Sequence, residues 1–255
     1  MNTDRLNSER EIRRYYRALY SAWGGQNWWP AETRFEVIVG AYLTQGTAWL
    51  NVERALGNLR AAGILTMARM REVGLRRLET LIRPSGYFRQ KARRLKTFVA
   101  YLDAQHKGSI DELFSVPLAL LREELLALNG VGPETADSIL LYAGNYPVFV
   151  VDGYARRIFT RHQLIPETAN YEEIRDAAEH ALRPLGGLAS RSTKPRSASG
   201  SAHTPSLMSE ATRSPLAQIY NEAHALIVAA GKSHCGKSQP KCDGCPLQAF
   251  LPRGK

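Results

Sequence analysis

The chain has 255 residues, of which 44% are hydrophobic, so it can bury one large core or two smaller ones. Its 34 Lys and Arg against 24 Asp and Glu give a formal net charge of +10, which favours a polyanionic partner. No apolar run approaches the roughly 18 residues of a membrane-spanning helix, and residues 1–14 lack a signal-peptide core. We therefore expect a cytoplasmic protein with no membrane partner.

Apolar residues recur at helical spacing through most of the chain. The pattern predicts helices at 35–45, 52–65, 75–82, 118–129, 152–162 and 216–232. The one β-branched stretch, PVFVVD at 147–152, is short and stands alone, so it is predicted to be a buried connector. The fold class is therefore predominantly α.

The segment 186–215 differs in composition from the rest of the chain. It is rich in Ser, Thr, Pro, Gly, Ala and Arg and poor in large apolar residues. Such a segment cannot bury enough apolar surface to fold alone. We predict a disordered insertion, because helical periodicity resumes directly after it.

The sequence LNGVGPETA at 128–136 predicts a hairpin between two helices. Gly130 and Gly132 flank the apolar Val131, so the loop can turn tightly and present backbone N–H groups beside a helix N-terminus. Such a loop can hold a DNA phosphate without reading the base sequence. Pro133 suits the first turn of the second helix. Alone, two glycines between helices indicate no more than an ordinary turn.

A lone carboxylate, Asp152, follows this hairpin at the start of the next predicted helix, where aspartate is a favoured N-cap. The order of hairpin, connector and aspartate resembles the helix-hairpin-helix (HhH-GPD), endonuclease III-like superfamily of base-excision DNA glycosylases. The likeness runs over about 28–161 and resumes at 216–245, so it covers most of the chain outside the insertion.

The resemblance implies an all-α fold of two helical domains with the DNA cleft between them. One would be a six-helix barrel at 33–146 that contains the hairpin, and the other would combine 1–32 with 147–185 and 216–255. The implied partner is double-stranded DNA with a damaged base, bound by a monomer that associates with the nucleoid through DNA. The hairpin residues that would contact DNA are Gly130, Val131, Gly132, Glu134 and Thr135.

Asp152 has the chemistry that such an enzyme needs. Breaking an N-glycosidic bond builds positive charge on C1′ and the ring oxygen of the sugar, so a nearby carboxylate stabilises the transition state more than the ground state. The same group can orient an attacking water. We predict that Asp152 is catalytic, against the alternative that it only caps its helix, and no cofactor is required for this step.

Glu134 decides between two branches of the superfamily. Members with lyase activity carry a lysine at this position of the hairpin, and its amine attacks C1′. A carboxylate cannot form an imine, so we expect a monofunctional enzyme that uses water. The alternatives are a glycosylase with lyase activity on oxidised or mismatched bases and a non-catalytic protein that keeps only the hairpin.

Four stretches, 28–47, 83–95, 130–140 and 216–220, are similar to the bacterial 3-methyladenine DNA glycosylases of the endonuclease III type. This similarity implies a base pocket formed by Trp28, Trp29, Pro30, Trp49 and Lys232. An alkylated base that carries positive charge is attracted to an indole face by roughly 0.5–2 kcal/mol. The alternative for Trp28 and Trp29 is packing in the core.

Two polar features have a DNA-binding and a plain surface interpretation. In the superfamily, the side chain equivalent to Gln45 fills the gap left by the flipped nucleotide, but a surface glutamine would look the same. A basic run either contacts phosphates or forms a solvated helix face. It consists of Arg89, Lys91, Arg93, Arg94 and Lys96.

The cysteines Cys235, Cys242 and Cys245 have the spacing C-x6-C-x2-C. In endonuclease III this spacing opens a four-cysteine loop that binds a 4Fe–4S cluster. The fourth position is Leu251 here, whereas cubane clusters normally take four thiolates. A zinc site with His234 and a loop without metal therefore stay open beside the cluster.

Overall fold

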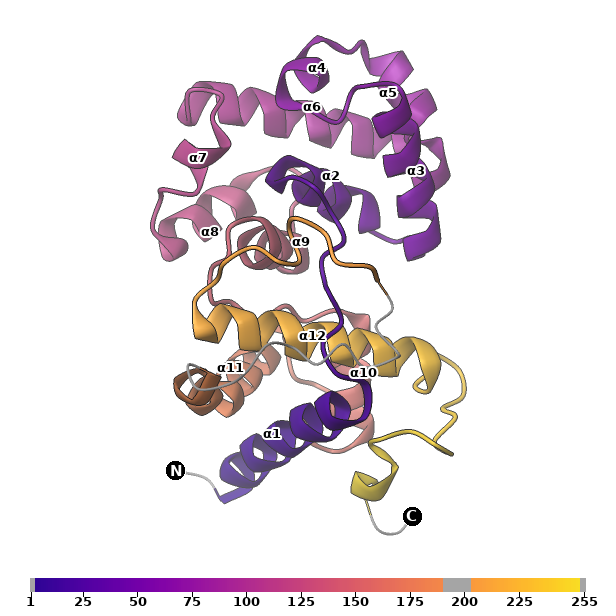
Figure 1. The fold of residues 1–255 in the computed structure, drawn as a ribbon, viewed down its shortest axis with the longest axis vertical. Helices are drawn as coiled ribbons and strands as arrows, with labels where there is room; N and C mark the ends of the chain where they lie inside the picture. The colour runs from indigo at the N-terminus through magenta and orange to yellow at the C-terminus, as the bar shows by residue number, and fades with distance from the viewer. Residues whose placement is uncertain (1–2, 190–202, 253–255) are drawn as a thin grey trace. The chain divides into compact units, whose positions relative to one another are not determined.

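The computed structural model describes residues 3–189 and 203–252, which form helices and no strand (Figure 1). The predicted all-α class is therefore confirmed for these residues. The chain forms two compact units, one made of Met1–Pro30 with Asn145–Lys255 and the other of Ala31–Gly144. We call them unit 1 and unit 2. Over the described ranges, no helix is long and apolar enough to cross a membrane.

Unit 1 is built around its last long helix. This helix, α12, packs against α1, α10 and α11 (Figure 1), and most of its residues from Ala217 to Gly231 are buried. It can be buried on nearly all sides because its sequence, LAQIYNEAHALIVAAG, is apolar around most of its circumference. The helices of unit 1 are α1 (Thr3–Trp23), α10 (Gly153–Arg161), α11 (Tyr171–Ala189), α12 (Pro215–Ser233) and the 3-10 turn η3 (Gln248–Phe250).

Unit 2 has the helix α2 at its centre. Every residue from Phe35 to Leu43 in α2 is buried, and the helix packs against α3, α6, α9 and η2. Thr33 caps its N-terminus by accepting the Glu36 N–H. The helices of unit 2 are α2 (Arg34–Thr44), α3 (Trp49–Ala61), α4 (Met67–Glu72), α5 (Leu75–Leu81), η1 (Arg83–Ser85), α6 (Phe88–Gln105), α7 (Ile110–Leu113), α8 (Leu118–Ala127), α9 (Pro133–Ser138) and the π-helical η2 (Ile139–Ala143).

The β-branched stretch before Asp152 is a buried connector, as predicted. Residues 148–151 are buried and form no strand. Two backbone N–H groups of this connector are bonded to side chains of α11, because Phe149 N donates to Glu179 Oε1 at 2.9 Å and Val151 N to the Tyr171 hydroxyl at 3.3 Å. Side chains thus supply the partners that a neighbouring strand would otherwise provide.

The predicted disorder of 186–215 is wrong at both described ends of that segment. Residues 186–189 complete α11, and residues 203–214 pack on the rest of unit 1, with Met208 buried. The His203 carbonyl accepts from Asn27 Nδ2 at 3.0 Å, and the Ser206 hydroxyl donates to the Trp29 carbonyl at 3.2 Å. The composition suggested disorder because the segment has few large apolar residues. Its described part is held by hydrogen bonds and by one buried methionine, Met208. Residues 190–202 lie outside the described residues.

Candidate functional site

Asp152 caps the N-terminus of α10, as predicted. Its backbone is extended, and its Oδ1 accepts the N–H groups of Tyr154 at 2.9 Å and Ala155 at 2.8 Å. These two bonds hold one carboxylate oxygen at the end of the helix. The side chain is 15% exposed, so the carboxylate lies close to the surface of unit 1.

The second oxygen of Asp152 faces a residue that sequence analysis missed. His224 Nε2 lies 3.7 Å from Asp152 Oδ2. The imidazole is buried in α12 and meets the Phe149 ring edge-on at 6.1 Å. Burial lowers the pKa of His224, the carboxylate of Asp152 opposes this shift, and the cation of Lys232 adds to it. The available signal was a set of polar residues, Asn221, Glu222 and His224, in a helix whose other buried residues are mostly apolar.

A glycine lets α10 approach α12 closely. A Cβ on Gly231 would lie 2.2 Å from Cδ1 of Tyr154, so the tyrosine ring occupies the space that any other residue at 231 would fill. Arg157 covers the same ring, with its guanidinium carbon 4.9 Å from the ring centroid. This packing fixes α10, and with it Asp152, against α12.

Among the predicted pocket residues of unit 1, the two tryptophans lie against each other and Lys232 lies near one of them. Trp28 and Trp29 are buried, with ring centroids 4.8 Å apart. The exposed Lys232 has its Nζ 5.9 Å from the Trp28 ring centroid. His203, which was not predicted, lies against the same indole at 5.2 Å. Burial of both indoles fits the alternative of core packing as well as a base pocket, and Pro30 is half-buried beside them.

In unit 2 the predicted hairpin lies between α8 and α9. Gly130 has a φ of +80°, which favours glycine, and Pro133 opens α9. Val131 and Thr135 are buried, whereas Gly132 and Glu134 are exposed. The two helices are joined by a bidentate ion pair, in which Arg122 Nε donates to Asp137 Oδ1 at 2.7 Å and Arg122 Nη2 to Asp137 Oδ2 at 3.2 Å.

Gln45 is bound to this hairpin. Its Nε2 donates to the Gly130 carbonyl and to the Thr135 hydroxyl, both at 2.9 Å. Its Oε1 accepts from Arg94 Nη1 at 2.6 Å. The residue expected to fill the gap of a flipped nucleotide is thus held by the loop expected to grip the DNA backbone. Trp49 belongs to the same unit and is the half-buried first residue of α3.

The basic residues of α6 do not form one exposed surface. Lys91 is buried and donates to the carbonyls of Leu43 at 2.8 Å and Ser85 at 2.6 Å. Burial lowers its pKa to about 8, with a smaller contribution from Arg94. Lys91 therefore stabilises the C-terminal end of α2 by binding its carbonyl and does not face solvent. Arg89 and Arg93 are exposed.

Tyr87 is an exposed aromatic residue that sequence analysis missed. It precedes α6 with a φ of +44° and is 72% exposed. Its Cε2 lies 3.8 Å from where a Cβ on Gly46 would stand, so it is next to the residue that follows Gln45. An aromatic ring held in solvent beside this loop can stack on a nucleobase.

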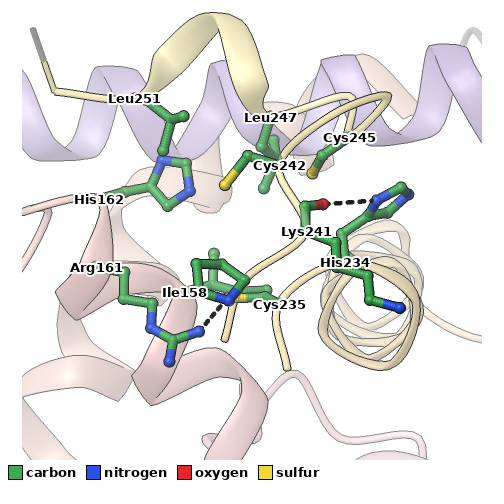
Figure 2. A pocket seen from close by; sticks show the side chains of 12 residues that line it. Ile158, Arg161, His162, His234, Cys235, Lys241, Cys242, Cys245, Leu247 and Leu251 are labelled. Carbon is green, nitrogen blue, oxygen red and sulfur yellow. Dashed lines mark hydrogen bonds between the residues drawn. The ribbon is translucent and has the colours of Figure 1, made fainter. Parts of the chain in front are cut away.

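The three cysteines line one cavity of about 290 Å³, with Leu251 and His162 on its wall (Figure 2). Arg161 donates from Nη1 to Cys235 Sγ at 3.3 Å and to the Gly236 carbonyl at 2.7 Å. His234 stacks on Trp23, with ring centroids 6.0 Å apart.

These residues do not fit the metal groups that the spacing suggested. Leu251 brings an alkyl group where a fourth thiolate is needed. In the part of the chain that the structure describes, no group of three or more His, Cys, Asp or Glu is arranged to bind a metal ion. We therefore derive no chemical step from a metal or cluster.

Known proteins resemble this chain in sequence and in fold. The sequence model of the HhH-GPD superfamily base excision DNA repair proteins matches residues 39–184, more than half of the chain. The chain belongs to this superfamily. The predicted superfamily is thereby confirmed, and the protein is a DNA glycosylase of base-excision repair.

The glycosylase has relatives over nearly its whole length. It is 40% identical over 241 residues to MJ1434 of Methanocaldococcus jannaschii, provisionally named a DNA repair glycosylase, with 94% of each chain covered. It is 26% identical over 228 residues to endonuclease III-like protein 1 of Bos taurus, covering 89% of this chain and 61% of that protein.

Solved structures show the same fold. Helicobacter pylori 3-methyladenine DNA glycosylase (MagIII), bound to 1,N6-ethenoadenine, has a TM-score of 0.70 and 28% identity, covering 88% of this chain and 97% of that one. A non-covalent endonuclease III–DNA complex has a TM-score of 0.68 at 20% identity over 98% and 96% of the chains, which is a likeness of fold alone.

Proposed function

We propose that this glycosylase removes an alkylated base, such as 3-methyladenine, from double-stranded DNA by hydrolysis and acts as a monomer. The observation that carries the proposal is the geometry of Asp152. One oxygen is fixed by two N–H groups at 2.8 and 2.9 Å, and the other is bonded to neither of them. A carboxylate held in this way is preorganised to stabilise the positive charge that develops on the sugar.

Water as the nucleophile is supported by the hairpin sequence. The run LNGVGPETA at 128–136 contains no lysine, and Glu134 stands where a Schiff-base amine would be needed. An alkylated base also leaves readily without a protonated side chain, because its ring already carries the positive charge. Asp152 then has two tasks, which are to stabilise the sugar cation and to orient water.

The preference for an alkylated base is supported by Trp28 and by the relative of known structure. The Trp28 indole offers an electron-rich ring, and MagIII, at 28% identity, was crystallised with a modified adenine. An aromatic face and a nearby polar group are typical of pockets that hold a flipped base. Trp49 is the further aromatic candidate in unit 2.

Grip on the DNA backbone is assigned to the hairpin. Its exposed Gly132 and Glu134 leave the backbone of the loop accessible. The net charge of +10 supports binding to phosphates. We assign the contacts to bases in the opened duplex to Gln45 and to Tyr87, which lies beside Gly46.

The test is a glycosylase assay on duplexes that each carry one lesion, read with and without alkaline cleavage of the abasic product. We expect excision of alkylated adenines, with strand breaks only after alkali. Asp152→Asn keeps the capping oxygen and should lower the single-turnover rate by roughly 100-fold or more. Asp176→Asn, in an exposed Asp–His pair, is the control. Full activity of Asp152→Asn would refute the proposed mechanism.

A further inference from the structure

The two oxygens of the Asp152 carboxylate have different surroundings. Oδ1 accepts two backbone N–H groups of α10 at 2.9 and 2.8 Å. Oδ2 faces the Nε2 atom of His224 at 3.7 Å. This distance exceeds a hydrogen bond by less than about 1 Å, so a small rotation of the ring would make one.

His224 is an unusual residue for its position. It lies in the most buried stretch of α12, between Ala223 and Ala225, and is 5% exposed. Placing an imidazole there instead of an apolar side chain carries a desolvation penalty unless the ring has a polar partner. The ring directs Nε2 toward the carboxylate that we assign to catalysis.

The surroundings of His224 favour the neutral imidazole. Burial is the largest influence, and the Lys232 cation acts in the same direction. Asp152 acts against both, and the Phe149 ring contributes no charge. A neutral ring can turn an N–H toward Oδ2 without cancelling the negative charge of the carboxylate.

We propose that His224 is a positioning residue for Asp152. Its neutral N–H holds Oδ2 while the two N–H groups of α10 hold Oδ1, so the carboxylate is fixed on both sides and keeps its charge. This inference rests on the proposed function of Asp152. It assigns His224 no contact with DNA, because the imidazole acts through the carboxylate.

Three variants separate this role from packing. His224→Gln keeps an N–H at nearly the reach of Nε2, and His224→Leu keeps the volume without the donor. His180→Leu is the matched control, because His180 contacts Asp176 at 2.9 Å in an exposed pair of the same unit. For each, we would measure the single-turnover excision rate, the Kd for lesion-bearing duplex, the thermal unfolding temperature and the pH–rate profile.

We expect His224→Leu to lower the excision rate by roughly 10- to 100-fold with an unchanged Kd, the usual loss when the hydrogen-bond partner that orients a functional side chain is removed. The Gln variant should recover most of this loss. On the acid side, the rate of the Leu variant should decline at a higher pH than that of the Gln variant, because only Gln supplies an N–H to the charged carboxylate. The His180 control should match the wild type.

A wild-type rate for His224→Leu, or equal rates for the Leu and Gln variants, would overturn the proposal. If the Leu variant does not fold, His224→Asn takes its place. The amide of Asn is too short to reach Oδ2, so we expect the Asn variant to be slower than the Gln variant. Equal excision rates for the two would also overturn the proposal. Asp152→Asn is measured in parallel: if it is inactive while the His224 variants are normal, only this inference fails, and if it is active, the proposed function fails.

Discussion

The guanidinium of Arg94 occupies the space in which a side chain on Gly130 would lie. A Cβ at 130 would be 2.0 Å from Arg94 Nε, and the same arginine donates to Gln45 at 2.6 Å. Gln45 in turn donates to the Gly130 carbonyl. The hairpin, the loop after α2 and the helix α6 are therefore joined through one glycine, one glutamine and one arginine.

Gly130→Ala should disrupt this group. The methyl would displace Arg94, and alanine is strained at a φ of +80°. We expect the free energy of unfolding to fall by about 1–3 kcal/mol. We also expect roughly 10-fold weaker binding of undamaged duplex, because the displaced hairpin would lose one or two phosphate contacts. Chemical denaturation and fluorescence anisotropy would measure both.

The control for that change is Gly57→Ala, in the middle of α3. A Cβ there would meet nothing within 4 Å, so the variant should be unchanged or stabilised by up to about 1 kcal/mol. If Gly130→Ala behaves like Gly57→Ala, the contact between Arg94 and the hairpin has no importance for stability or binding.

The charge at position 134 predicts the outcome of a trapping experiment. With Glu134 in the hairpin, we expect no covalent adduct when the enzyme and an abasic duplex are treated with borohydride. An endonuclease III with lyase activity serves as the positive control. Efficient trapping would show that another amine attacks C1′, and repeating the experiment with Lys232→Met would show whether that amine is Lys232.

Lys232 should influence which bases leave fastest. Its exposed amine lies 5.9 Å from the centre of the Trp28 ring, so it disfavours a base with a full positive charge on that face. Lys232→Met should raise the excision of cationic 3-methyladenine relative to neutral 1,N6-ethenoadenine by roughly 5-fold, or about 1 kcal/mol. Single-turnover rates on the two duplexes give the ratio, and an unchanged ratio would show that the charge of Lys232 does not act on the bound base.

Glu222 should make stability depend on pH. The carboxyl is buried in α12 and accepts the Gln26 N–H at 2.7 Å. Burial raises its pKa from 4.5 to about 7, and the Gln26 bond and Arg213 oppose the shift. The folded state thus keeps a proton that the unfolded state releases between these values. Its stabilising contribution is complete below pH 4.5 and is lost as the pH rises to about 7.

Glu222→Gln keeps the acceptor and cannot ionise. The free energy of unfolding of this variant, relative to the wild type, should therefore increase by about 3 kcal/mol between pH 4.5 and pH 7. Urea denaturation at a series of pH values measures this difference, with the exposed Glu53→Gln as a control for the same change in charge. A difference that stays constant with pH would contradict the raised pKa.

Local signals in the sequence predicted part of the site. The N-cap at Asp152 and the positive φ at Gly130 follow from the preferences of single residues in known positions, and the helices follow from apolar periodicity. Pro133 could be assigned for the same reason, whereas the role of Glu134 follows from the resemblance to the superfamily. These features need no knowledge of distant parts of the chain.

The remaining features depend on contacts between residues far apart in sequence. His224 reaches Asp152 from another helix, Arg94 meets Gly130 through tertiary packing, and the order of 203–214 comes from bonds to residues 27, 29 and 145. Periodicity and composition describe neighbours along the chain, so they carry no information on such pairs. Lys91 differs from the expectation for the same reason. Its place in a basic run suggested an exposed side chain, whereas tertiary packing buries it.

The segment 203–214 is bonded to residues next to both points at which the chain passes between unit 1 and unit 2. Ser206 binds the Trp29 carbonyl at the point where the chain leaves unit 1, and Arg213 binds Asn145 Oδ1 at 2.9 Å where the chain returns. Ser209 connects the two, because it bonds to Ser206 and its carbonyl accepts from Arg213. The two points at which the chain leaves and re-enters unit 1 are thus linked by one short stretch of chain. Because these bonds all lie within unit 1, they hold the two crossing points of the chain in fixed positions on that unit.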